Sequence, residues 1–231
     1  MAVIRTEKVD LKVNGAGAWG YLAQPDDSAL HPGVVLIQEW WGIEPHIQDL
    51  AQKLAVEGFV VLVPDLYHGK IATEPDDAQK LMMATVQNLE RVFKEISYAL
   101  DYVKALPNVG PKKLGLIGFC MGGLVTWELA SQYPDLGAIV PFYGVMYEPT
   151  PEKAAKINAP VLAIYGEADA YVSPEQRAKI AQVMQEAGRN LQIEVYPAGH
   201  AFINPDHGAW HEASAQKAWP QALNFLKENL K

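Results

Sequence analysis

The chain of 231 residues has a formal net charge of −8, from 19 Lys and Arg against 27 Asp and Glu, and 49% of its residues are hydrophobic. This composition excludes global disorder, and the negative charge argues against nucleic acids and membrane surfaces as partners. The one cysteine, Cys120, excludes an intrachain disulfide and a four-cysteine zinc site. The sequence shows no apolar leader and no run of about 20 apolar residues, so we expect a soluble, cytoplasmic protein.

Two kinds of hydrophobic pattern in the sequence predict the strands. Residues 9–13 and 18–22 read as a hairpin around Asn14-Gly15, a dipeptide that tolerates positive φ. Later runs are continuous and β-branched, as in strands that are buried on both faces of a parallel sheet. These runs span residues 34–37, 59–63, 114–117, 138–142 and 161–165, and residues 193–196 are predicted to form one further strand.

Helical spacing occurs between the predicted strands. The segments are residues 47–56, 75–106, 124–132, 174–187 and 207–230, and Pro220 is expected to kink or split the last one. Alternation of strands and helices predicts an α/β fold: an open, mostly parallel sheet with helices on both faces and an N-terminal antiparallel hairpin. We expect one domain over residues 1–231, with ligands beyond the carboxyl ends of the strands.

The segment Gly118-Phe119-Cys120-Met121-Gly122-Gly123 lies between a predicted strand and a predicted helix. This is the context of the G-x-S-x-G nucleophile elbow of α/β-hydrolases, with Cys in place of Ser. The central residue is forced into a strained turn, and the glycines let neighbouring backbone pass close to it. The alternative is a small buried cysteine that packs as a hydrophobe. The glycines favour a nucleophile, and the helix N-terminus behind it favours the thiolate.

Two further candidates follow later strands. Asp169 ends the segment Gly166-Glu167-Ala168-Asp169, where it could orient an imidazole, although Glu167 competes for that role and an Asp often caps a loop. His200 follows the strand at 193–196, and a lone His is more often a surface or core residue. The order Cys120, Asp169, His200 is nonetheless the chain order of nucleophile, acid and base in α/β-hydrolases.

Three segments carry a family resemblance: Gln38-Glu39-Trp40-Trp41-Gly42, Pro64-Asp65-Leu66-Tyr67 and the segment around Cys120. With them the chain resembles the dienelactone hydrolase family of α/β-hydrolases over nearly its whole length. The resemblance implies that Glu39 contacts the resting thiol and accepts its proton as substrate binds, with His200 and Asp169 completing a triad. It also implies an oxyanion hole formed by the backbone N–H groups of Trp40 and Met121.

The position of Glu39 in the sequence also favours a role as a base, independently of the resemblance. A carboxylate at the end of a buried strand and before two tryptophans would be partly desolvated, which makes it a better base. The alternative is a solvated loop glutamate. We expect Trp41, Tyr67 and Phe202 to contact the substrate, although core packing of Trp41 and loop capping around Tyr67 are open alternatives.

Other motifs in the sequence give weaker evidence for a functional site. His207 and His211 have the i, i+4 spacing that can bind zinc on one helix face, but the glutamate of H-E-x-x-H is missing, so we expect no metal. No phosphate-binding loop is present, and we expect no cofactor. Arg91 reads as a residue of a solvated helix surface.

The sequence therefore predicts a hydrolase of carboxylic esters or lactones that acts through an acyl-thioenzyme. The alternative is a hydrolase fold that binds a ligand or partner without turnover. A dithiol redox cycle is excluded because there is no second cysteine. Family members that act on dienelactone hold its carboxylate with arginines, one of them shortly after the catalytic His. Residues 201–205 contain no Arg, so a neutral or aromatic ester or lactone is equally open. The oligomeric state is not predicted.

Overall fold

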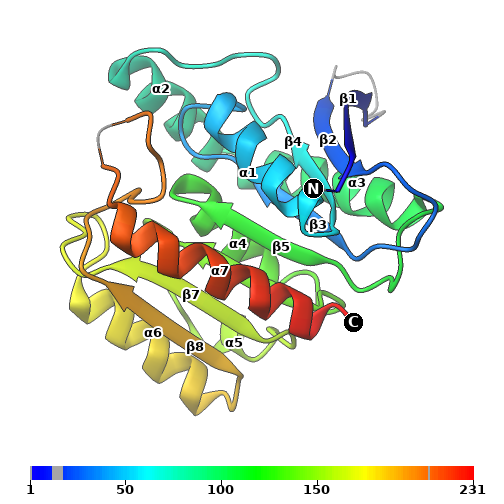
Figure 1. Cartoon of the computed structure of the whole chain (residues 1–231). Coiled ribbons are helices and arrows are strands. Elements are labelled where there is room, and N and C mark those ends of the chain that lie inside the picture. The colour runs from blue at the N-terminus through cyan, green and yellow to red at the C-terminus, as the bar shows by residue number, and fades with distance from the viewer. Residues whose placement is uncertain (1, 12–17, 208) are drawn as a thin grey trace. The chain divides into compact units, whose positions relative to one another are not determined.

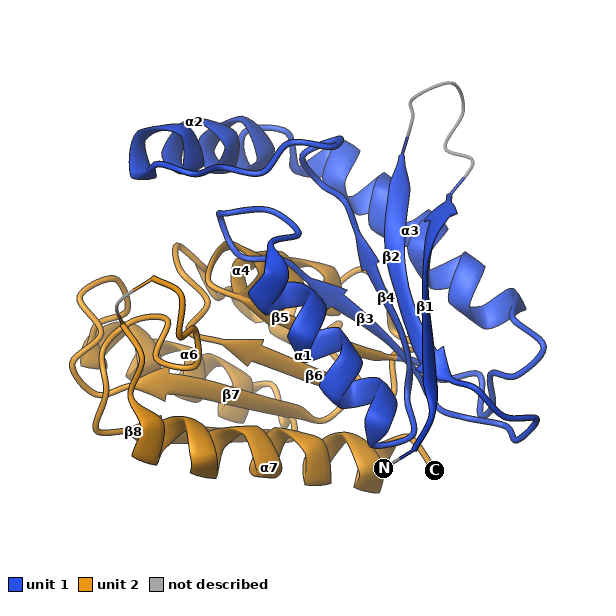
Figure 2. Cartoon of the chain, turned by 45° about the horizontal axis from the view of Figure 1, so that its top comes forward, with its two compact units in different colours: residues 1–114 blue, residues 115–231 orange. Residues whose placement is uncertain are grey.

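The computed structural model describes residues 2–11, 18–207 and 209–231. The chain divides into two compact units, unit 1 with residues 1–114 and unit 2 with residues 115–231 (Figure 2). Both units are built from strands and helices in alternation, which confirms the predicted α/β class. Within the described ranges, we find no helix with the length and apolarity that a membrane span requires.

Unit 1 contains four strands in the order β1 (Ile4–Asp10), β2 (Trp19–Pro25), β4 (Val60–Pro64), β3 (Gly33–Ile37). β2 pairs antiparallel with β1 and with β4, whereas β3 and β4 are parallel. The predicted hairpin is confirmed, but β1 begins and ends earlier than predicted. Val9 is the one buried residue of β1, so its buried face left little signal in the sequence. The predicted turn at Asn14-Gly15 lies outside the described residues.

Helices cover both faces of the unit 1 strands, and every residue of β3 and β4 is buried. α1 (Pro45–Val56) packs on β2 and β4, and α3 (Leu89–Ala105) packs on β3 and β4 from the other side (Figure 2). The single helix predicted over residues 75–106 is wrong, because α2 (Pro75–Val86) ends before α3 begins. Asn88 leaves helical geometry and its side chain accepts the N–H of Arg91, so it caps a new helix.

Unit 2 contains the strands β5 (Gly115–Phe119), β6 (Ala138–Phe142), β7 (Val161–Gly166) and β8 (Leu191–Tyr196), in that order and all parallel. The predicted runs in this unit are confirmed, with bounds that differ by at most two residues. Because parallel strands share a direction, the segments after β5, β6, β7 and β8 begin at the same edge. This edge is where Cys120, Asp169 and His200 follow their strands.

Among the described residues of this unit, the helices that accompany these strands are α4 (Met121–Ala130), α5 (Pro151–Ala154), α6 (Pro174–Glu186) and α7 (Glu212–Asn229). α7 lies across β6 and β7, as Figure 1 shows, and α4 packs on β5 and β6. α4 begins directly after Cys120, three residues earlier than predicted, and α5 was not predicted.

Pro220 was expected to kink or split the last helix, and the split is wrong because α7 is continuous through this residue. Pro220 and Gln216, whose carbonyl loses its helical donor, are both exposed, so water can replace the lost hydrogen bond. The predicted start at residue 207 is also wrong, since α7 begins at Glu212.

Candidate active site

Cys120 forms the bend between β5 and α4. Its φ of 55° and ψ of −113° are unusual for a residue with a side chain, and such a conformation costs about 1–3 kcal/mol. Hydrogen bonds hold the bend: the N–H of Cys120 donates to the carbonyl of Phe142 at 3.1 Å, and its carbonyl accepts from Gly123 at 3.0 Å. The predicted strained turn is confirmed.

Gly118 makes this bend sterically possible. A Cβ at Gly118 would lie 2.2 Å from the carbonyl oxygen of Gly122 and 2.4 Å from Oγ1 of Thr126. The first turn of α4 therefore passes directly over the end of β5, and a side chain would push the two apart.

The Cys120 side chain lies at the start of a helix. Cys120 is the residue before the first turn of α4 and is 7% exposed, and Met121 is the first residue of that helix. Backbone amides at a helix start carry partial positive charge, which favours an anion such as a thiolate or an oxyanion at this place.

Asp169 and His200 meet in unit 2. Nδ1 of His200 lies 2.8 Å from Oδ2 of Asp169, and the carboxylate side chain is fully buried whereas the imidazole is 15% exposed. The competing carboxylate of Glu167 is exposed and faces solvent. Such an arrangement fixes the imidazole ring and leaves its Nε2 for proton transfer.

Gly166 brings the segments of the acid and the base together. A Cβ at Gly166 would lie 2.4 Å from the carbonyl oxygen of Ala198 and 2.5 Å from that of Gly199, the residue before His200. β7 and the segment after β8 can therefore approach closely only because residue 166 has no side chain. Just before it, burial raises the pKa of Tyr165 above its usual range, so this hydroxyl is a neutral part of the core.

Arg177 is a contributor that sequence reasoning missed. It lies in the first turn of α6, is 8% exposed, and donates from Nη1 to the carbonyls of Gly166 and Val172, each at 3.0 Å. These carbonyls flank the loop that carries Asp169, so Arg177 ties both ends of that loop together. The signal available in the sequence is an arginine just inside a helix that starts at Ser173-Pro174.

Two tyrosines that were not predicted contact His200. The rings of Tyr143 and Tyr171 approach the imidazole edge to face, with centroid distances of 5.1 and 4.9 Å. Tyr143 is fully buried, and it also contacts the predicted substrate residue Phe202 at 5.8 Å. Phe202 itself is fully buried and also packs on Tyr196, with ring centroids 5.8 Å apart. Its observed environment is thus aromatic core.

The other predicted residues belong to unit 1. Glu39 follows β3 and is 1% exposed. Trp40 and Trp41 contact each other edge to face at 5.0 Å, and the hydroxyl of Tyr67 donates to the carbonyl of Trp40 at 3.0 Å. Trp41 and Tyr67 are both buried. The loops after β3 and β4 are thereby tied to each other.

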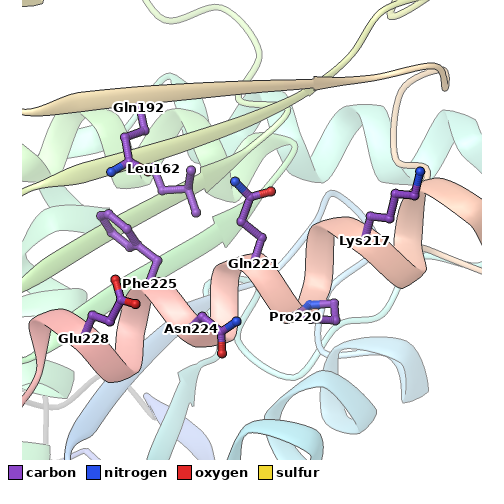
Figure 3. Close-up of a pocket in the computed structure, with 8 residues that line it drawn as sticks. All are labelled: Leu162, Gln192, Lys217, Pro220, Gln221, Asn224, Phe225 and Glu228. Carbon is purple, nitrogen blue, oxygen red and sulfur yellow. The ribbon is translucent and has the colours of Figure 1, made fainter.

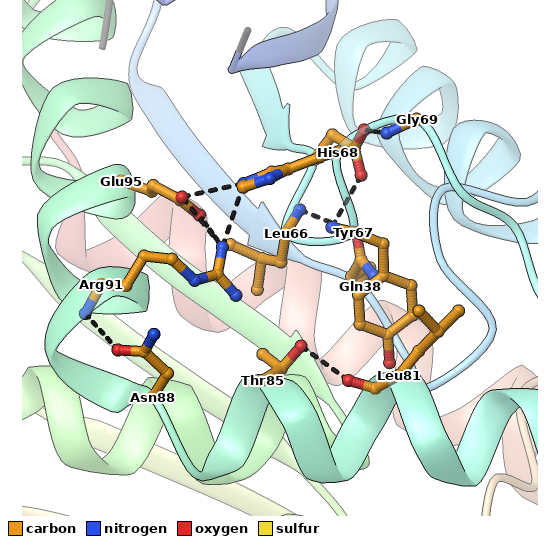
Figure 4. A network of polar contacts seen from close by, with 11 residues as sticks. Gln38, Leu66, Tyr67, His68, Gly69, Leu81, Thr85, Asn88, Arg91 and Glu95 are labelled. Carbon is orange, nitrogen blue, oxygen red and sulfur yellow. Dashed lines mark hydrogen bonds and ion pairs between the residues drawn. The ribbon is translucent and has the colours of Figure 1, made fainter. Parts of the chain in front are cut away.

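A polar network supports the loop after β4 (Figure 4). Nε2 of His68 and Nη1 of Arg91 both contact the buried carboxylate of Glu95, each at 2.8 Å. Asp65 holds the same loop by accepting the N–H groups of Tyr67 and Gly69. Arg91 lies on a helix surface as predicted, with 30% of its side chain exposed, but it is not an ordinary solvated residue because it pairs with the buried Glu95.

The structure offers little for a metal. Across the described ranges, no group of three His, Cys, Asp or Glu side chains is arranged to hold a metal ion. His207 and His211 do not share a helix face, because both precede α7, and Nδ1 of His211 lies 2.7 Å from Oγ of Ser214.

A cavity of about 390 Å³ lies between α7 and the strands β7 and β8 (Figure 3). Its wall includes Leu162 and Gln192, near the amino ends of these strands, and Lys217 and Glu228 of α7. Asp169 and His200 follow the opposite, carboxyl ends, so this cavity is separate from them.

Known proteins are similar to this chain in sequence and in fold. "Protein usf" of Aquifex pyrophilus is 36% identical over 231 residues, which cover 97% of this chain and 99% of that protein. A protein of Aquifex aeolicus named "Putative carboxymethylenebutenolidase" is 34% identical over 232 residues, with coverage of 97% and 99%.

The structural comparison agrees. The crystal structure of a dienelactone hydrolase-like promiscuous phosphotriesterase from metagenomic libraries superimposes with a TM-score of 0.91, at 25% identity and over 100% of both chains. The family model described as "Dienelactone hydrolase family" matches residues 19–230, which include every predicted site residue. With this match, and with relatives above 30% identity over nearly its whole length, the chain belongs to the dienelactone hydrolase family.

Proposed function

We propose that this protein hydrolyses lactones or carboxylic esters with Cys120 as nucleophile, His200 as base and Asp169 as the acid that orients it. The observation that carries the proposal is the 2.8 Å contact between Asp169 and His200, at the edge of unit 2 where Cys120 occupies a strained bend. Binding of a ligand alone gives no reason for this combination of a paired imidazole and a cysteine at a helix start.

The reaction runs in two stages. The thiolate of Cys120 attacks the acyl carbon, and the resulting tetrahedral oxyanion collapses with cleavage of the ester C–O bond. The thiol proton of Cys120, accepted by Glu39 and passed on to His200, is donated by His200 to the departing alkoxide, which leaves an acyl-thioenzyme. His200 then takes a proton from water, the hydroxide attacks the thioester, and the C–S bond breaks to release the acid and the thiolate. A lactone gives a single hydroxy acid. No step requires a cofactor.

The roles of Glu39, Trp40 and Met121 extend the proposal through the family resemblance. Glu39 would accept the thiol proton, and its almost complete burial supports this role because a desolvated carboxylate is a better base. The amides of Trp40 and Met121 would donate to the oxyanion, and each such donor typically contributes about 10²- to 10³-fold in rate. Trp41, Tyr67 and Phe202 remain proposed substrate contacts.

The test uses a panel of enol-lactones and activated aryl esters. We expect Cys120→Ala to abolish turnover, and mass spectrometry of the quenched wild-type reaction to find the acyl group on Cys120. Asp169→Asn should lower kcat by about 10⁴-fold, whereas the matched control Glu167→Gln, at the exposed carboxylate, should stay near wild type.

Two results would refute the proposal. One is turnover by Cys120→Ala at the wild-type rate. The other is no turnover of any substrate together with a thiol that reacts with iodoacetamide no faster than free cysteine, which would favour a binding protein.

A further inference from the structure

The imidazole of His200 has one buried and one exposed aromatic neighbour. Tyr143 is fully buried, whereas 67% of the surface of Tyr171 is open to solvent. Both rings meet the imidazole at nearly the same angle, 64° and 65°. Tyr143 therefore belongs to the support of His200, and Tyr171 presents an accessible apolar surface next to it.

Tyr171 is held in place by the acid itself. Its backbone N–H donates to Oδ1 of Asp169 at 2.8 Å, while Oδ2 of the same carboxylate contacts His200. The carbonyl of the next residue, Val172, accepts from Arg177. A large exposed aromatic side chain on a fixed backbone loses little conformational entropy when a ligand packs on it.

The charge around this surface is negative. The segments after β6, β7 and β8, residues 143–150, 167–173 and 197–211, contain no Lys or Arg. Glu167 and Asp206 are exposed, and the carboxylate of Glu148 pairs with Lys179. Arg177 is buried and donates to backbone carbonyls. These three segments therefore offer an anionic substrate group no Lys or Arg side chain, and their exposed carboxylates favour a neutral group.

The chemistry of the step selects the half of the substrate that reaches Tyr171. His200 protonates the leaving alkoxide, so the oxygen of the alcohol half must come within hydrogen-bond distance of the imidazole. The group attached to that oxygen then lies beside the neighbours of His200, of which Tyr171 is the exposed aromatic one.

We propose that the substrate carries a neutral, apolar alkyl or aryl group on its alcohol side and that Tyr171 is the specificity-determining residue that receives it. This inference rests on the proposed function and narrows it to a substrate class. Stacking or edge contact with one aromatic ring accounts for up to about 10-fold in kcat/KM.

The experiment compares benzyl butyrate, 4-carboxybenzyl butyrate and methyl butyrate. We expect the wild type to prefer the benzyl over the carboxybenzyl ester by at least about 10-fold in kcat/KM. Tyr171→Ala should lower kcat/KM for the benzyl ester about 10-fold more than for the methyl ester, and the matched variant Tyr171→Phe should keep the wild-type ratio between the two esters. Tyr171→Arg should shift the preference towards the carboxybenzyl ester.

Equal or faster hydrolysis of the carboxybenzyl ester by the wild type would overturn the inference, as would an equal loss for benzyl and methyl esters in Tyr171→Ala. A second readout needs no turnover: alkylation of Cys120, the one cysteine, by N-benzyl iodoacetamide and by iodoacetate, each relative to glutathione. A preference for the neutral reagent without any esterase activity would refute the proposed function alone. Cys120-dependent turnover with no preference in either assay would refute this inference alone.

Discussion

A methyl group at Gly166 tests whether close backbone packing sets the distance between the acid and the base. In Gly166→Ala the new Cβ would lie 2.4 Å from the carbonyl oxygen of Ala198, where ordinary contact begins at 3.4 Å. The two segments must therefore separate by about 1 Å, the difference between these distances. The two nearest atoms, the carbonyl oxygens of Ala198 and Gly199, belong to the backbone, so no flexible side chain can move aside.

The displacement predicts two magnitudes. Overpacking of this kind costs about 1–3 kcal/mol of unfolding free energy, which in a chain of this size lowers Tm by about 2–12 °C. A shift of about 1 Å between Asp169 and His200 would stretch their 2.8 Å contact beyond hydrogen-bond distance. Misplacement of catalytic groups on this scale costs about 10²-fold in kcat/KM.

Gly199→Ala is the matched control. A Cβ at Gly199 would have no atom within 4 Å, although this residue directly precedes His200. We expect this variant to keep the activity and Tm of the wild type. Steady-state kinetics on an aryl ester, thermal unfolding, and the proton NMR signal of the His200 Nδ1–H would be measured for both variants. Full activity in Gly166→Ala, or an equal loss in Gly199→Ala, would refute the reasoning.

Three further outcomes are expected. Arg177→Met should lower the unfolding free energy by about 2–4 kcal/mol because two buried carbonyls lose their donor, and Arg177→Lys should recover part of this loss. Urea denaturation measures both variants, and an unchanged midpoint in Arg177→Met would contradict the role of the guanidinium. Glu95→Gln should cost about 1–2 kcal/mol, since its partners His68 and Arg91 are partly exposed. A stability equal to wild type in the same assay would argue against the network. A hydrogen bond from His31 holds the pKa of Asp27 below its usual value of 3.8. The stability that the Asp27 carboxylate contributes is therefore present above about pH 4 and is lost as the pH falls through the lowered pKa. Tm should fall less between pH 6 and pH 3 in Asp27→Asn than in the wild type, and an equal fall would rule out this linkage.

The strands from β3 to β7 were predictable because burial on both faces leaves an unbroken hydrophobic run. β6 has the predicted bounds of residues 138–142, and each of its residues is buried. The break between α2 and α3 was not predictable in the same way, because helical spacing continues on both sides of Asn88. A single asparagine that changes from helix interior to cap leaves only a weak trace in the sequence. The split expected at Pro220 did not occur for a different reason. Pro220 is exposed in α7, so water can replace the backbone hydrogen bond that a proline removes from a helix.

The candidate site was predictable at the level of chain order. Cys120, Asp169 and His200 each follow a strand, and parallel strands bring such positions to one edge. The contacts of Tyr171 and Arg177 depend instead on the path of a short loop, which has no periodicity. The same loop path decides that Asp169 is buried and Glu167 exposed, a distinction that two carboxylates two residues apart cannot reveal by themselves.

Asp169 shows why the acid, the base and the proposed substrate surface form one unit. Its two oxygens have different tasks, since Oδ2 contacts His200 and Oδ1 accepts the backbone N–H of Tyr171. A carboxylate can accept a hydrogen bond at both oxygens. An asparagine amide in its place would direct its NH₂ group, a donor, at either His200 or the backbone N–H of Tyr171. The charge and the loop conformation are therefore coupled: the group that orients the imidazole also fixes the ring beside it. Arg177 and Gly166 support this coupling from the two ends of the loop, and so residues that do not touch the imidazole help to determine both the orientation of His200 and the position of the proposed substrate surface at Tyr171.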